Sequence, residues 1–65
     1  MALLAEARKG KGMTQAEVAI ALGKPQSFVA KYENGERRID VVEFVDIATV
    51  LDIEPNEIFS RLRQK

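Results

Sequence analysis

Hydrophobic residues recur along the chain at the spacing of a helix, and polar or turn-forming residues divide them into five groups. The clearest group holds Phe44, Ile47, Ala48 and Leu51, which stand at positions i, i+3, i+4 and i+7. This spacing places the four side chains on one face of a helix. No segment shows the alternation of apolar and polar residues that a half-buried strand requires. The pattern therefore predicts an all-α protein, a compact bundle of five short helices.

Turn-forming and capping residues mark the ends of the first two predicted helices. The first helix spans about Leu3–Lys9, and the glycines that follow it favour a helix stop. Thr14 and Glu17 then form a T-x-x-E capping box, in which each side chain satisfies a free amide at the helix start. Gly23 ends this second helix. Both helices are therefore predicted to be short, with sharp boundaries.

The same signals delimit the remaining helices. Pro25 begins the third helix, since its fixed φ suits a first turn, and Asn34-Gly35 ends it as a left-handed turn pair. Asp40 and a glutamate three residues later repeat the capping logic for the fourth helix. Glu54-Pro55 begins a fifth helix. Its apolar side is formed by Ile58, Phe59 and Leu62.

The joint between the second and third helices is the most informative feature of the sequence. Two helices that meet at a steep angle through a short turn need a glycine in the turn and a small residue where their axes approach. Gly23 and Ala19 stand at these positions. The residues expected to pack both helices on the rest of the domain are Val18, Leu22, Val29 and Tyr32. This arrangement predicts a helix-turn-helix.

The helix-turn-helix belongs to a longer pattern of residues at fixed spacing: Thr14-Gln15-Ala16-Glu17-Val18-Ala19, Leu22-Gly23, Gln26-Ser27-Phe28-Val29-Ala30-Lys31-Tyr32-Glu33-Asn34-Gly35, Phe44, Ile47, Ala48, Leu51, Ile53 and Ile58. In this pattern the chain resembles the lambda-repressor-like helix-turn-helix family (Cro and repressor proteins, xenobiotic-response-element type). The resemblance covers nearly the whole chain, from Leu4 to Phe59. The resemblance implies one DNA-binding domain over residues 1–65, with the helix-turn-helix at about residues 14–34.

The resemblance also implies that the third helix enters the major groove of DNA with its N-terminal half over the base edges. At about 100° per residue, Val29 and Tyr32 define the inward side of this helix. The candidates for base readout are Gln26, Ser27, Phe28 and Lys31. Glutamine can bond adenine in two places, and lysine can bond guanine acceptors. Phe28 fits either a place at the edge of the core or an exposed ring that touches a thymine methyl group.

Phosphate contacts are expected from the segments that bracket the third helix. Gln15 lies at the start of the second helix, where the helix dipole favours an anion. The other candidates lie in the turn before the third helix and at or after its end: Lys24, Asn34, Arg37 and Arg38. A solvated loop is the alternative explanation for the two arginines.

A structural ion pair between Arg8 and Glu33 is implied by the resemblance. Arg8 stands seven residues before Gln15, where the family has an arginine that reaches the glutamate near the end of the motif. Such a pair would tie the first helix to the third. Glu33 and Tyr32 are therefore expected to be structural and not to contact DNA.

Composition removes several classes of function. The chain has no cysteine and no histidine, so it lacks disulfides, the common zinc ligands and the usual general base. The apolar run Met1–Ala5, which no other run exceeds, is far too short to span a membrane, and no basic segment precedes it as in a secretory signal. We expect no metal, no cofactor, no small-molecule ligand and no membrane partner. A cytoplasmic location fits this composition.

The charge is balanced overall but unevenly distributed. The net charge is zero, with seven basic against four acidic residues up to Arg38 and three basic against six acidic residues after it. A basic half suits an anionic partner, because local potential matters more than the total charge. Ordinary solvated helix faces are the alternative explanation.

These observations predict a sequence-specific regulator of transcription, of repressor or controller type, that binds an operator in double-stranded DNA. A module this small covers few base pairs, which favours a homodimer on a two-fold related site. Phe59 and Leu62 are the expected dimer interface, unless they close the core over Ile47 and Leu51. A protein-interaction module of the same fold is the alternative function. An enzyme is not expected, because the carboxylates are scattered and little room remains for a closed pocket.

Overall fold

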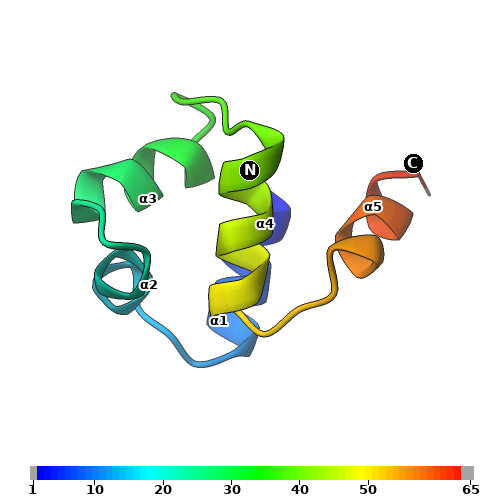
Figure 1. The fold of residues 1–65 in the computed structure, drawn as a ribbon, viewed down its shortest axis with the longest axis horizontal. Coiled ribbons are helices and arrows are strands. Elements are labelled where there is room, and N and C mark those ends of the chain that lie inside the picture. The colour runs from blue at the N-terminus through cyan, green and yellow to red at the C-terminus, as the bar shows by residue number, and fades with distance from the viewer. Residues whose placement is uncertain (1, 64–65) are drawn as a thin grey trace.

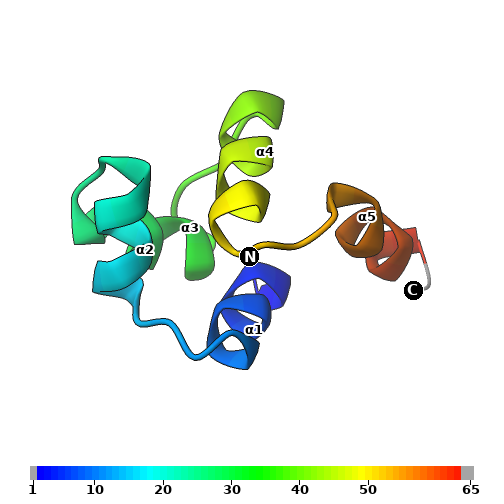
Figure 2. The same ribbon diagram turned by 60° about the horizontal axis from the view of Figure 1, so that its bottom comes forward.

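The structure, a computed structural model, describes residues 2–63 and the side chains of residues 2–61. The described residues form five helices and no strand: α1 (Ala2–Gly10), α2 (Gln15–Leu22), α3 (Gln26–Glu33), α4 (Val41–Val50) and α5 (Pro55–Arg63). In Figures 1 and 2, α4 lies in the middle, with α2 and α3 on one side of it and α5 on the other. The predicted all-α fold of five short helices is confirmed. None of the described helices is long and apolar enough to cross a membrane.

The helices share a single hydrophobic core, and each contributes to it. The buried side chains are Leu4, Val18, Ala19, Val29, Tyr32, Phe44, Ile47, Ala48, Leu51 and Ile58. All four residues of the predicted stripe on α4 are among them. Burial raises the pKa of Tyr32 to about 12, because it disfavours the charged phenolate. The helical spacing in the sequence therefore identified the inward faces of α2, α3 and α4 correctly.

Both predicted capping boxes are present. At the start of α2, the Glu17 amide donates to Thr14 Oγ1 (3.1 Å), and the Thr14 amide donates to Glu17 Oε1 (2.7 Å). At the start of α4, the Glu43 amide donates to Asp40 Oδ1 (2.7 Å), and the Asp40 amide donates to Glu43 Oε1 (3.1 Å). Such reciprocal bonds fix the first residue of a helix, because they satisfy amides that have no partner inside it.

Two details at the ends of α3 differ from the sequence-based prediction. Pro25 is the N-cap of α3 and not its first helical residue, since its ψ of 153° is extended. Its ring fixes φ at −65° but leaves ψ free, so the chain can turn into the helix one residue later. Asn34 keeps right-handed backbone angles (φ −84°, ψ −1°), and Gly35 alone is left-handed, with φ 77°. One glycine is enough for the turn.

Asp52 ends α4 in the left-handed conformation that glycine usually adopts, with φ 56°. Its amide donates to the Thr49 carbonyl (3.1 Å), and the Ile53 amide donates to the Ala48 carbonyl (2.9 Å). These two bonds satisfy carbonyls at the helix end in the Schellman pattern. The sequence does not mark this helix end, because aspartate adopts the left-handed conformation far less often than glycine does.

Candidate nucleic-acid interface

The joint between α2 and α3 is built as the sequence predicted. Gly23 has φ 69°, and its amide donates to the Ile20 carbonyl (3.1 Å). The next amide, of Lys24, donates to the Ala19 carbonyl (3.0 Å), which completes a Schellman turn at the end of α2. Ala19 is 3% exposed and lies in the core that α3 covers. The turn therefore ends α2 sharply and sets the start of α3 only a few residues later.

The face of α3 opposite the core is polar and exposed. Val29 and Tyr32 are buried, whereas Gln26, Ser27 and Lys31 are exposed. The N-cap, Pro25, offers no side-chain acceptor to the amides of the first turn, unlike the N-caps of α2 and α4. The three polar candidates for base readout thus lie on the open side of a helix whose opposite side is packed in the core.

Phe28 lies at the edge of the core, half-buried on the side of α3. Its ring meets Tyr32 edge-on, with centroids 5.5 Å apart and an angle of 75° between the rings. Two cations approach the same ring: Lys24 Nζ lies 5.6 Å from its centroid and Arg37 Cζ lies 5.0 Å from it. Both distances fall within the range of cation–π attraction. The ring therefore gathers a lysine from the turn before α3 and an arginine from the loop after it.

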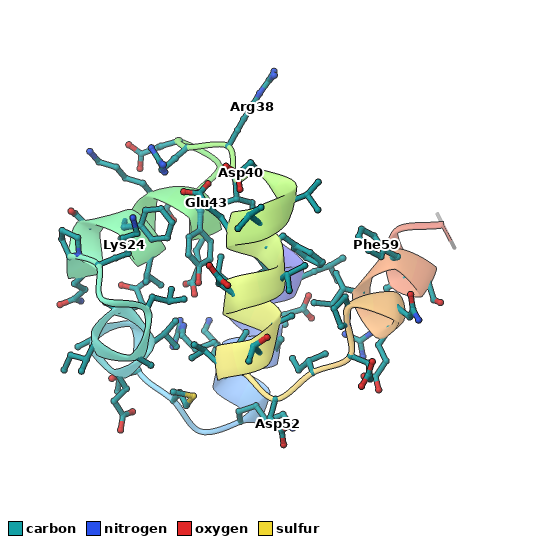
Figure 3. All side chains as sticks on the ribbon, viewed as in Figure 1. Lys24, Arg38, Asp40, Glu43, Asp52 and Phe59 are labelled. Carbon is teal, nitrogen blue, oxygen red and sulfur yellow. The ribbon has the colours of Figure 1, made fainter. Side chains whose placement is uncertain are left out.

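Glu43 holds the arginine from the other side. Its Oε2 accepts a hydrogen bond from Arg37 Nη2 at 3.1 Å, while its Oε1 accepts from the Asp40 amide. The backbone bond from Asp40, followed by the bond from Arg37, lowers the pKa of Glu43 below its usual value. We call Lys24, Phe28, Arg37 and Glu43 the Phe28 cluster. Figure 3 shows Lys24 and Glu43 on the side of the molecule that carries α3.

The implied pair between Arg8 and Glu33 lies at the centre of a larger network. Arg8 Nε donates to Glu33 Oε2 (2.7 Å), Nη2 to Glu33 Oε1 (3.1 Å) and Nη1 to the Met13 carbonyl (2.9 Å). The two side chains are only 12% and 5% exposed. Burial is the largest influence on Glu33 and opposes its ionisation, but the bonds from Arg8 and Gln15 outweigh it and lower the pKa. The network joins α1, α2 and α3.

Gln15 belongs to this network, which its sequence position did not indicate. Its Nε2 donates to Glu33 Oε1 at 3.0 Å, and the side chain is half-buried. An amide group carries a second N–H and an acceptor oxygen, so one internal bond still leaves Gln15 able to contact a phosphate. Glu33 therefore orients the side chain at the start of α2.

The other expected phosphate ligands differ in the contacts that their side chains make with the rest of the protein. Asn34 Nδ2 donates to Glu36 Oε2 at 3.4 Å on the surface. Arg38 is exposed, forms no hydrogen bond or ion pair with the described residues and points away from the helices in Figure 3. Arg37 and Lys24 lie on the Phe28 ring. The expected phosphate ligands thus lie on several segments of the chain: at the start of α2, in the turn before α3, and at or after the end of α3.

Apolar side chains remain exposed on α4 and α5. Phe59 is 47% exposed and rests on Phe44, with ring centroids 5.1 Å apart. On α4, Val41, Val42 and Val45 are 74%, 70% and 43% exposed. We call these three valines and Phe59 the α4–α5 apolar surface. The Leu62 side chain, expected to contribute here, lies outside the described residues. The three valines were not among the predicted interface residues, although α4 carries more apolar residues than one buried stripe requires.

The described residues contain no group of three or more acidic, histidine or cysteine side chains that could hold a metal ion. What they do contain is a rigidly supported helix with an open polar face, flanked by cations. Such an arrangement suits contact with base edges and phosphates.

Comparison with known proteins agrees with this geometry. A family model described as helix-turn-helix matches residues 4–58. An XRE-family like protein from Pseudomonas syringae pv. tomato has a similar solved structure, with a TM-score of 0.86 and 50% identity over 95% of this chain and 78% of that chain. The restriction-modification controller protein C.AhdI from Aeromonas hydrophila superposes with a TM-score of 0.80 and 39% identity, over 86% of this chain and 85% of that chain. No curated protein matches in a sequence search.

Proposed function

We propose that this chain, which belongs to the XRE-type helix-turn-helix family, regulates transcription by recognising a specific sequence in double-stranded DNA through α3. The family is one of DNA-binding regulators and not of enzymes. The observation that carries the proposal is the exposed polar face of Gln26, Ser27 and Lys31 on a helix whose opposite face is buried. Side chains of these types can bond base edges in the major groove.

Base readout and phosphate binding are assigned to different residues. Gln26, Ser27 and Lys31 discriminate between base pairs, since base edges carry the sequence information. Arg38 and Asn34 bind the phosphates beyond the C-terminal end of α3. Both side chains are exposed, which supports this assignment. Gln15 binds a phosphate at the start of α2, oriented by its bond to Glu33.

Two variants test this division. Gln26→Ala is expected to cost about 1–3 kcal/mol on the preferred duplex, to cost little on mixed-sequence DNA and to relax preference at one or two base pairs. Arg38→Ala should weaken both duplexes nearly equally and reduce the slope of log K against log salt by about one unit per half-site. The preferred duplex is selected from a random pool, and both are titrated at several salt concentrations.

Two outcomes of these titrations would contradict the proposal. If Gln26→Ala weakened binding to both duplexes alike, α3 would not be the reading helix. If the protein bound neither duplex even at low salt, where DNA-binding proteins bind most tightly, DNA recognition would be refuted and the alternative of a protein-interaction module would replace it.

We further propose a homodimer on a two-fold related operator, formed through the α4–α5 apolar surface. Phe59 lies on α5, on the opposite side of α4 from α3, so a partner placed there leaves α3 free. Phe59 packs on Phe44 of α4, the helix that carries the three exposed valines, and clustered exposed apolar side chains often mark a contact surface. The likeness to a restriction-modification controller favours a controller or repressor role.

A further inference from the structure

The Phe28 cluster brings two expected phosphate ligands onto one aromatic ring. Lys24 reaches the ring from the turn before α3, and Arg37 reaches it from the loop after α3. The two segments are separated in the chain by α3, and both side chains contact the Phe28 ring. Their head groups lie 5.6 and 5.0 Å from the centroid, within the roughly 6 Å over which a ring attracts a cation.

Arg37 is held at two points and still open to solvent. The Phe28 ring supports its guanidinium, and Glu43 Oε2 accepts one of its N–H groups at 3.1 Å. The Asp40 amide donates to Glu43 Oε1, so the carboxylate that accepts from Arg37 is restrained in position. A guanidinium has five N–H donors, and the Arg37 side chain is 46% exposed. Donors therefore remain available for an anion from outside.

From this geometry we propose that Phe28 is a positioning residue for binding the DNA backbone, whose ring holds Lys24 and Arg37 as one preformed phosphate site. The inference rests on the proposed function, because it requires DNA to lie against α3. Long cationic side chains lose rotamer entropy when they bind a phosphate. Cations already held on the ring lose less, so the complex is more stable. Phe28 thus adds affinity without reading sequence.

This role differs in its consequences from contact with a thymine methyl group. A ring that touches a base changes the preference for one base pair. A ring that holds two phosphate ligands changes affinity for every sequence by the same factor. It also leaves the number of phosphate contacts, and hence the salt slope, unchanged. The half-buried ring, which forms a T-shaped pair with Tyr32 and has two cations over it, fits the second role.

Phe28→Leu tests the inference, because leucine keeps an apolar contact with the core but has no ring face. Dissociation constants are measured on the selected duplex and on a mixed-sequence duplex at several salt concentrations, after unfolding curves establish that the variant is folded. Affinity for both duplexes should fall by the same factor, roughly three- to tenfold, with the salt slope unchanged. Phe28→Tyr, which keeps the ring, should retain wild-type affinity. Phe28→Met replaces the leucine variant if that one does not fold.

A mutant cycle shows whether Phe28 acts through the cations. In a background that carries Lys24→Ala and Arg37→Ala, replacing Phe28 by leucine should have no further effect on affinity. A full loss in that background would overturn the inference, as would a loss confined to the selected duplex. Unchanged binding by Phe28→Leu, with wild-type sequence preference intact, would refute this inference alone. Failure of the wild-type protein to bind either duplex would refute the proposed function and the inference with it.

Discussion

Replacing Arg8 by alanine should remove the strongest polar link between helices in the described part of the chain. The side chain makes two bonds to the Glu33 carboxylate and one to the Met13 carbonyl. After the change, Gln15 Nε2, at 3.0 Å, is the one side chain among those described that still donates to the carboxylate. Because Glu33 is only 5% exposed, water cannot fully replace the missing guanidinium.

The structure allows the cost to be estimated. Breaking one partner out of a buried, hydrogen-bonded ion pair costs about 3–5 kcal/mol, since the other charge is stranded. Arg8 is 12% exposed, so the pair lies at the edge of this class, and about 3 kcal/mol is expected. Glu33→Ala should cost somewhat less, because the longer arginine can move its head group towards water. A domain of this size has a total stability of only roughly 3–10 kcal/mol, so either change is large.

Urea unfolding of the two single variants and of the double variant measures the effect. The double variant should be more stable than the sum of the two single losses predicts, by about 2 kcal/mol, because no charge is stranded. Arg37→Ala is the matched control: it breaks an ion pair whose side chains are 46% and 21% exposed, so its effect on stability should be far smaller. Additive losses in the cycle would refute the coupling.

The dependence on pH follows from the lowered pKa of Glu33. A carboxyl whose pKa is lower in the folded than in the unfolded state stabilises the fold above its unfolded pKa. The stabilisation is therefore fully present above about pH 4.5, the ordinary value, and is lost as the pH falls through the folded-state pKa. Wild type and Glu33→Gln should differ in unfolding midpoint at pH 7 and converge in acid. A constant difference across that range would contradict the assignment.

Three further changes have definite expected outcomes. Phe59→Ala should give a folded monomer with weakened operator binding, as judged by light scattering and titration; loss of the fold would assign the ring to the core beside Phe44, and unchanged mass would exclude the interface. Gly23→Ala should lower the free energy of unfolding by about 1 kcal/mol, since an added Cβ meets no neighbour and only the left-handed backbone resists it. Asp52→Gly should raise that free energy by about 0.5 kcal/mol for the converse reason, and a loss of stability would show that the aspartate side chain stabilises the turn.

Local signals in the sequence were sufficient to place most helix boundaries and the core. Capping boxes and helix-ending glycines act through bonds within a few residues, so they can be recognised without knowing the fold. The stripe of Phe44, Ile47, Ala48 and Leu51 is equally local, because helical periodicity alone brings these side chains to one face. The same argument placed Gln26 and Lys31 on the open side of α3.

Contacts between segments were decided only by the tertiary structure. The sequence gives no measure of how far Arg37 lies from Phe28, and Glu43 was identified only as a capping residue before its second oxygen was found on Arg37. Gln15 likewise has an internal partner that a helix-start position does not reveal. These pairings depend on how α2, α3 and α4 pack, since packing sets the distances between residues remote in sequence. The chain by itself determined which side chains face outward, and the packing determined which of them meet.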